Sequence, residues 1–297
     1  MSIVFLDGAY VPKGEARVSV DDRGFLFGDG VYEVSPAYRG SFFTMDRHLE
    51  RMRRGLRALR IDFDPDTLPP VHERLLDEND LRDREVAYVY VQITRGVAPR
   101  THAFPSGEHA GTKPSVYAFA KEYHRPSRDR WDRGFAAVTV PDRRWNRVDI
   151  KSVNLLPNVL AQQAAVDAGV EDALLVRDGV ALEGSHNNFF VVKDGVVVTH
   201  PASNAILHGI TRGVVLEMCE TMGLPVELRA IQVEELQDVD EAFFTGTTTE
   251  VRPTVTIDGR TVGDGRPGPV TRRLMEGFLT RTRRVAESGA RRVGSVS

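Results

Sequence analysis

The stretch DIKSVNLLPN, residues 149–158, contains a lysine in a chain that otherwise uses arginine for positive charge. Only five of the 39 basic residues are lysines. Four of them adjoin turns or polar segments, namely Lys13, Lys113, Lys121 and Lys193, whereas Lys151 leads into an apolar run. An amine can form a Schiff base, which a guanidinium cannot. Lys151 is therefore the candidate catalytic residue.

The composition is that of an ordinary globular protein. A chain of 297 residues is long enough for about two domains. A net charge of -3 argues against nucleic acid or an anionic membrane as a general partner. The single Cys219 excludes an internal disulfide, and the sequence contains neither a signal-peptide pattern nor an apolar run that could span a bilayer. We expect a cytoplasmic protein with no membrane partner.

Turn pairs predict antiparallel sheet. Aspartate–glycine pairs between short apolar or β-branched runs are strong hairpin signals. The chain has four such pairs, at residues 7–8, 178–179, 194–195 and 258–259. Apolar residues spaced by three and four predict helices over residues 44–60, 158–169, 210–223 and 268–287. The fold class is therefore α/β, of an α+β-like kind.

The polar segment at residues 121–133 separates two halves of the chain. It predicts a smaller N-terminal α/β domain (1–120), a linker (121–133) and a larger C-terminal domain (134–287). The last ten residues, 288–297, lack periodicity and are predicted to form a disordered tail.

Two apparent motifs do not predict a site. Residues 263–268, GDGRPG, match the dinucleotide-binding pattern, but they follow a predicted hairpin and too few residues remain for a βαβ unit. One cysteine and eight histidines without metal-binding spacing predict no metal site.

A lysine that carries pyridoxal 5'-phosphate (PLP) requires a carboxylate near the pyridine nitrogen and donors for the phosphate. Glu183 ends an apolar strand, residues 209–211 begin a helix, and residues 245–250, TGTTTE, include three consecutive threonine hydroxyls, at 247–249. Arg51 adjoins the apolar stripe of its helix and either faces solvent or points inward at an anion. A carboxylate such as Glu183 at the end of an apolar strand is more often a solvated rim residue, and threonines alone are simply typical of a β-prone strand end. Together they supply an amine, an acid and two donor clusters.

Seven stretches carry a resemblance to a known family. They are DRGFLFGDGVYEV (22–34), HLERM (48–52), QITRGVAPRTHAFP (92–105), DIKSVNLLPNVLAQQ (149–163), LEGSHNNFFVV (182–192), ILHGITR (206–212) and GTTTEVRP (246–253). In order and spacing the chain resembles the class IV (fold-type IV) PLP-dependent aminotransferases, and among them the D-amino-acid aminotransferases, over about residues 2–280. The resemblance implies two mixed α/β domains with the cofactor at the domain interface, in a homodimer.

The resemblance also implies residue roles. Lys151 forms the Schiff base and moves the proton, and Glu183 pairs with the pyridine nitrogen. Further cofactor-binding positions are implied at Arg51, Leu207, Gly209, Ile210, Thr211, Thr247 and Thr248. The substrate α-carboxylate is implied to bind Tyr32, Arg100 and His102, the last two on a loop that reaches the neighbouring subunit. A bidentate guanidinium suits a carboxylate, although Arg100 and His102 alone would be ordinary exposed loop residues.

The activity implied is ping-pong transfer of an amino group from a D-amino acid to a 2-oxo acid, such as 2-oxoglutarate or pyruvate, with pyridoxamine phosphate as intermediate. The alternatives are branched-chain L-amino-acid or (R)-amine transamination, aminodeoxychorismate lysis, or a noncatalytic homologue. The loop with Arg100 and His102 favours D-amino acids. His186 replaces a small serine common in the family, and alternation places Val34 and Pro36 on the substrate side of their strand. The effects of His186 and Pro36 on substrate preference stay open.

Overall fold

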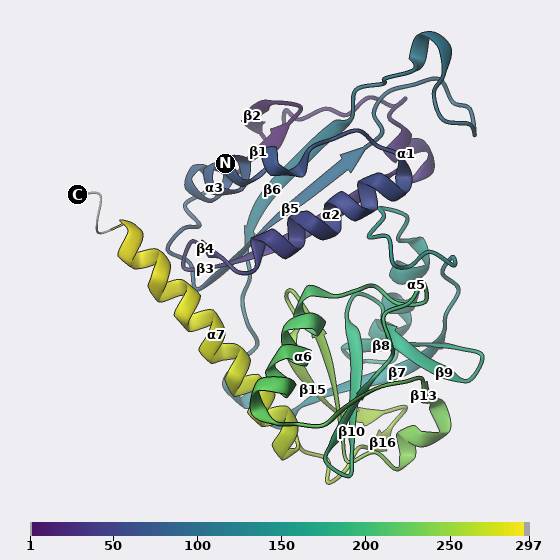
Figure 1. Ribbon diagram of the computed structural model, residues 1–297, viewed down its shortest axis with the longest axis vertical. Coiled ribbons are helices and arrows are strands. Elements are labelled where there is room, and N and C mark those ends of the chain that lie inside the picture. Colours follow the sequence, from purple (N-terminus) through teal and green to yellow (C-terminus); the bar gives the residue numbers. More distant parts are fainter. Residues whose placement is uncertain (1, 294–297) are drawn as a thin grey trace. The chain divides into compact units, whose positions relative to one another are not determined.

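The computed structural model describes residues 2–293 and forms two compact units (Figure 1). Unit 1 comprises residues 2–124, 150–154 and 282–293, and unit 2 comprises residues 125–149 and 155–281. The segment with Lys151 thus belongs to unit 1, whereas the sequence placed it in a C-terminal domain. The reason is backbone pairing with strand β3 (Gly30–Tyr38): Tyr32 N donates to Lys151 O at 3.0 Å, and Val153 N donates to Gly30 O at 3.1 Å.

Unit 1 is built on an antiparallel sheet of six strands in the order β2-β1-β6-β5-β3-β4. Besides β3, its strands are β1 (Ile3–Leu6), β2 (Ala9–Pro12), β4 (Ser41–Phe42), β5 (Val86–Thr94) and β6 (Ser115–Glu122). Its helices are α1 (Arg23–Phe27), α2 (Met45–Leu59) and α3 (Pro69–Glu78), with short 3₁₀ turns η1 (Pro65–Thr67) and η2 (Gly107–His109).

Helices α2 and α3 supply the core of unit 1. Leu56 of α2 and Leu75 of α3 pack in one buried cluster with Val31 of β3 and Val89 of β5. Side chains alternate along a strand, so Val31 and Glu33 face these helices, whereas Tyr32, Val34 and Pro36 face the other side of the sheet.

Unit 2 is built on a ten-stranded sheet. Its strands are β7 (Phe135–Pro141), β8 (Asp172–Arg177), β9 (Val180–Gly184), β10 (Asn188–Lys193), β11 (Val196–Thr199), β12 (Val226–Leu228), β13 (Ile231–Gln232), β14 (Glu241–Gly246), β15 (Glu250–Ile257) and β16 (Arg260–Thr261). Strands β10, β14, β15, β7, β8 and β9 follow one another in the sheet, and β9 pairs again with β10. These six strands therefore form a closed ring, and the closing pair is Glu183 opposite Asn188.

The helices of unit 2 are α4 (Arg128–Arg133), α5 (Leu156–Asp167) and α6 (Ile210–Met222), with the 3₁₀ helix η3 (Val233–Gln237). Helix α7 (Pro269–Val293) begins in unit 2. Helix α4 lies inside the predicted linker, and α7 continues past the predicted domain end at residue 287. The rest of the predicted tail, residues 294–297, lies outside the described residues. No helix within residues 2–293 is both long and apolar enough to cross a membrane.

Local sequence signals are confirmed. The four aspartate–glycine pairs predicted to form hairpin turns do so, joining β1 to β2, β8 to β9, β10 to β11, and β15 to β16. In each pair both residues have positive φ, for example Asp7 (50°) and Gly8 (99°), which is the conformation that two-residue hairpins require. The four predicted helices are α2, α5, α6 and α7. The predicted class of two mixed α/β units is also confirmed.

Candidate functional site

The predicted site residues divide between the two units. Unit 1 contains Tyr32, Val34, Arg51, Arg100, His102 and Lys151. Unit 2 contains Glu183, Leu207, Gly209, Ile210, Thr211, Thr247 and Thr248. Each group is described within its own unit.

Lys151 lies beside Tyr32. Its Nζ donates a hydrogen bond to the Tyr32 hydroxyl at 3.1 Å and lies 4.2 Å from the centre of the ring. The preceding Ile150 is buried in the core of unit 1 and fixes the backbone. The apolar run that follows is not buried throughout, since Leu156 is 66% exposed. Lys151 is half-buried because its segment lies along β3, and its amine is held in one direction by the phenol.

An aromatic surface surrounds Tyr32. Its ring stacks on Tyr90 of β5 at 5.4 Å between centres, and Tyr90 stacks on Phe119 of β6 at 5.1 Å. Burial raises the pKa of Tyr90 well above its ordinary value by desolvation, so this phenol stays protonated. Val34 lies on the same side of β3 as Tyr32 and is half-buried. This face of the sheet combines an amine, a phenol and flat apolar walls.

Arg51 points inward, and the anion that it meets is Glu33. Arg51 Nε and Nη2 donate to the two Glu33 oxygens at 2.6 and 2.9 Å, and His48 Nδ1 donates to Glu33 at 2.8 Å. All three side chains are buried. Burial opposes ionisation of Glu33, but Arg51 and His48 outweigh it and hold the pKa of Glu33 well below its ordinary value. Glu33 therefore orients the guanidinium of Arg51.

Arg100 and His102 lie on an exposed loop between β5 and β6. Both side chains contact Phe27, the last residue of α1. The Arg100 guanidinium lies 5.2 Å from the Phe27 ring centre, and the His102 ring lies 5.7 Å from it. The two residues therefore both lie close to one aromatic ring.

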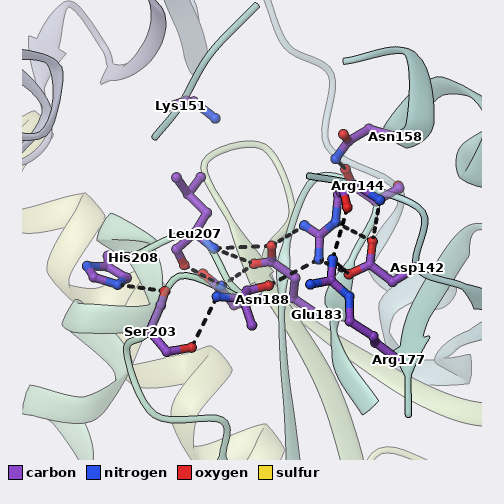
Figure 2. A network of polar contacts seen from close by, with 12 residues as sticks. Asp142, Arg144, Lys151, Asn158, Arg177, Glu183, Asn188, Ser203, Leu207 and His208 are labelled. Carbon is purple, nitrogen blue, oxygen red and sulfur yellow. Dashed lines mark hydrogen bonds and ion pairs between the residues drawn. The ribbon is translucent and has the colours of Figure 1, made fainter. Parts of the chain in front are cut away.

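In unit 2, Glu183 is the centre of a buried polar network (Figure 2). Its carboxylate accepts hydrogen bonds from Arg144 Nη1, from Asn188 Nδ2 at 2.7 Å, and from the backbone N–H of Leu207 at 3.1 Å. Asn188 Nδ2 also donates to Leu207 O at 2.8 Å. The closure of the six-stranded ring explains this arrangement, because it places Asn188 directly opposite Glu183.

The network continues beyond Glu183. Arg144 donates two hydrogen bonds to Asp142, one to each carboxylate oxygen. The oxygen Oδ2 of Asp142 also accepts a hydrogen bond from Arg177 at 2.8 Å. Burial raises the pKa of Glu183 to about 7, because loss of solvation outweighs the stabilising effect of Arg144 and the Leu207 N–H. A further cationic or N–H donor at Glu183 would oppose that shift.

Helix α6 offers backbone donors near this network. Its first N–H groups, at Ile210 and Thr211, have no acceptor within the helix. A Cβ on the N-cap Gly209 would lie 1.9 Å from Asn188 Oδ1, so the close approach of Asn188 requires glycine there. Arg212 is buried, and among the described residues its Nε has no hydrogen-bond partner. Free N–H groups and a buried cation together favour an anion.

Thr247 and Thr248 lie in the turn between β14 and β15, not at the end of a strand, and both are half-buried. The next residue, Thr249, is buried, and its hydroxyl oxygen accepts a long hydrogen bond of 3.5 Å from Asn187 Nδ2. Asn187 in turn donates to Asp172 at 2.7 Å. The threonine turn is thus tied to the turn that follows Glu183.

His186 lies on that turn and is exposed. Its Nδ1 is 2.8 Å from Ser185 Oγ, which also lies 2.6 Å from Gln162 Oε1 of α5. The Gln162 Nε2 donates to Glu171 O, so Oε1 faces the serine and accepts its single proton. His186 Nδ1 must therefore carry a proton to satisfy the second contact.

The sequence analysis missed several of these residues. Glu33 could have been found, because a carboxylate within an apolar strand is rarely buried unless it is paired. Arg144, Asp142 and Asn188 gave no such signal: Asn188 reaches Glu183 through the closed ring of strands, and Arg144, which pairs with the nearby Asp142, reaches Glu183 only through packing.

The chain is similar to known aminotransferases. Residues 30–257 match the family model described as class IV amino-transferase. The D-alanine aminotransferase of Staphylococcus haemolyticus is 44% identical over 280 residues, covering 94% of this chain and 97% of that protein. Among solved structures, the branched-chain amino acid aminotransferase of Escherichia coli has a TM-score of 0.85 at 26% identity, with 94% of each chain covered. The branched-chain aminotransferase of the archaeon Thermoproteus uzoniensis, solved with norvaline, has a TM-score of 0.84 at 28% identity and covers 95% of this chain and 94% of that one.

Proposed function

Because the chain belongs to the class IV aminotransferases, we propose that it is a PLP-dependent D-amino-acid transaminase. It transfers an amino group reversibly from a D-amino acid to a 2-oxo acid such as 2-oxoglutarate or pyruvate. The observation that carries this proposal is the 44% identity to a D-alanine aminotransferase over nearly the whole chain.

The residues present fit the cofactor. Three donors surround the Glu183 carboxylate, and one of them, the Leu207 N–H, is shared between its two oxygens, so the N–H of a pyridine ring could take one of those two positions. The N–H groups of Ile210 and Thr211 suit a phosphate. Further binding positions are Arg51, Leu207, Gly209, Thr247 and Thr248. The cofactor supplies an aldehyde that captures the amino group and a ring that withdraws electrons from Cα.

Lys151 moves the proton. Its Nζ holds the cofactor when no substrate is bound, and then accepts the proton from Cα of the amino acid. The Tyr32 hydroxyl, which accepts a hydrogen bond from Nζ at 3.1 Å, keeps the amine in one orientation. A positioned general base of this kind contributes about 10²–10⁴ in rate.

Arg100 and His102 bind the substrate α-carboxylate, with Tyr32 as a further donor and Val34 beside the substrate side chain. The loop of Arg100 and His102 serves the neighbouring subunit of a homodimer. An uncovered apolar face on α5 supports the homodimer: Leu156, Val159 and Leu160 are 66%, 59% and 62% exposed at spacing that puts them on one side of the helix.

Branched-chain L-amino-acid transamination is the second candidate. It is favoured by the structural likeness to branched-chain enzymes, such as the Escherichia coli protein with a TM-score of 0.85. The identities decide between the two, since the relatives named for D-alanine are 41–44% identical and the branched-chain structures 26–28%.

The test is a visible absorption spectrum of the purified protein with PLP, titrated separately with D-alanine and with L-leucine. Loss of the yellow band with D-alanine alone is expected. Loss with L-leucine alone would assign the protein to the branched-chain alternative. A colourless protein after addition of PLP would indicate a noncatalytic homologue.

A further inference from the structure

We propose that Phe27 and Arg23 of α1 are positioning residues for substrate binding, because they hold the loop of Arg100 and His102 in its binding conformation. This inference rests on the proposed function, in which that loop binds the substrate carboxylate. It assigns a role to helix α1, which contains none of the functional residues named above.

The loop needs support from outside itself. Arg100 and His102 are both exposed, and apart from the short η2 the chain between β5 and β6 has no helix or strand. Long exposed side chains lose conformational entropy when they are fixed on a ligand. A carboxylate site on such a loop therefore binds weakly unless contacts fix the loop beforehand.

Phe27 supplies one set of contacts. Its ring lies 5.2 Å from the Arg100 guanidinium and 5.7 Å from the His102 ring. A cation over an aromatic face is attracted by the ring quadrupole. One half-buried phenylalanine thus contacts both side chains that bind the carboxylate.

Arg23 supplies the other contact. It lies four residues before Phe27 and hence on the same side of α1, and its guanidinium lies 4.7 Å from the Phe27 ring centre. Arg23 Nη1 donates to Thr101 O at 2.8 Å, which fixes the backbone between Arg100 and His102. Arg23 is only 3% exposed, so the donor of this bond is buried even though Thr101 is exposed.

Helix α1 is itself anchored to the sheet. Arg23 Nε donates to Asp29 at 2.9 Å, and the same carboxylate accepts two hydrogen bonds from Arg95, at 2.7 and 3.0 Å. Arg95 follows β5, and its guanidinium lies 3.8 Å from the ring of Phe104 at the far side of the loop. Arg23 and Arg95 both bind the Asp29 carboxylate, and they contact the loop at Thr101 and at Phe104.

A double-mutant cycle on the holoenzyme tests this inference. Phe27→Leu keeps apolar bulk but removes the aromatic face, and it is expected to raise the KM for D-alanine and for pyruvate about fivefold. Its kcat and visible spectrum should match those of the wild type. In the Arg100→Ala/His102→Ala background, the same substitution should change KM less than about twofold, because the groups that Phe27 positions are absent.

Two variants serve as controls. Phe25→Leu makes the same chemical change on the same helix, but Phe25 is 73% exposed and residues two apart do not face the same side. It should leave both KM values unchanged. Phe27→Tyr keeps the ring and should retain the wild-type KM. All variants are compared at the same oligomeric state, measured by light scattering.

Trypsin cleavage after Arg100 gives a readout that does not depend on turnover. Cleavage after Arg260, the exposed first residue of β16 in unit 2, is the internal reference. Phe27→Leu should accelerate cleavage after Arg100 relative to Arg260, and Phe25→Leu should not.

The outcomes separate this inference from the proposed function. If removing Arg100 and His102 raises KM but Phe27→Leu does not, the inference is overturned and the proposed function stands. If Phe27→Leu has the same effect with and without Arg100 and His102, it acts elsewhere and the inference is again wrong. If removing Arg100 and His102 leaves KM unchanged, the carboxylate assignment itself fails.

Discussion

Arg144 donates a hydrogen bond to Glu183, and each of these two oppositely charged side chains is only 4% exposed. A buried charge that loses its partner is costly, because the interior solvates it poorly. Arg144 thus stabilises the ionised form of Glu183, and Glu183 and Asp142 stabilise the buried charge of Arg144.

Arg144→Gln should therefore destabilise the protein and weaken cofactor binding. Breaking a buried pair costs about 3–5 kcal/mol, and Asp142 retains Arg177 as a partner. The measurements are the urea unfolding midpoint and the dissociation constant of PLP. Arg147→Gln is the matched control, since Arg147 is 46% exposed and pairs with Asp149 on the surface. An equal effect of both substitutions would contradict the role given to Arg144.

Glu183→Gln should change the pH dependence of stability in the cofactor-free protein. The folded-state pKa of Glu183 is raised to about 7 from an ordinary 4.5. Its protonation thus stabilises the fold below about pH 4.5, and this contribution is lost as pH rises through 7. The loss is at most about 3 kcal/mol. Between pH 5 and 8 the thermal midpoint of the variant should fall less than that of the wild type; parallel curves would refute the shift.

Glu33→Gln should lower the unfolding midpoint, because Arg51 loses a buried anionic partner. The expected loss is about 3 kcal/mol. Glu50→Gln is the control, because Glu50 lies on the same helix as Arg51 but its side chain is 49% exposed and its ion pairs are on the surface. This substitution should leave the unfolding midpoint unchanged. Cofactor affinity should also fall in Glu33→Gln if Arg51 binds the phosphate. Full cofactor affinity in a folded Glu33→Gln protein would argue against that role.

Lys151→Ala should abolish turnover of D-alanine with 2-oxoglutarate, because no other amine is assigned to the proton transfer. A stopped-flow measurement of each half-reaction checks this, and a half-reaction that survives at the wild-type rate would sink the assignment. Lys121→Ala, at an exposed position in β6, is the control and should retain full activity.

The sequence by itself determines the local features of this protein. The turns of four hairpins follow from aspartate–glycine pairs, because only a few residue types accept positive φ at both positions. Four helices follow from apolar spacing and end signals. Lys151 and Glu183 could be singled out because each is a chemically distinctive residue at the edge of an apolar segment.

Contacts between distant segments were decided only by the tertiary structure. Arg51 pairs with a glutamate 18 residues earlier, and Arg23 binds a carbonyl 78 residues later. Asn188 reaches Glu183 because six strands close into a ring, and Lys151 joins unit 1 because its backbone pairs with β3. A propensity or a spacing describes a residue's near neighbours along the chain. The partner of a buried charge depends instead on how strands and helices pack, and packing brings together residues whose separation in sequence carries no signal.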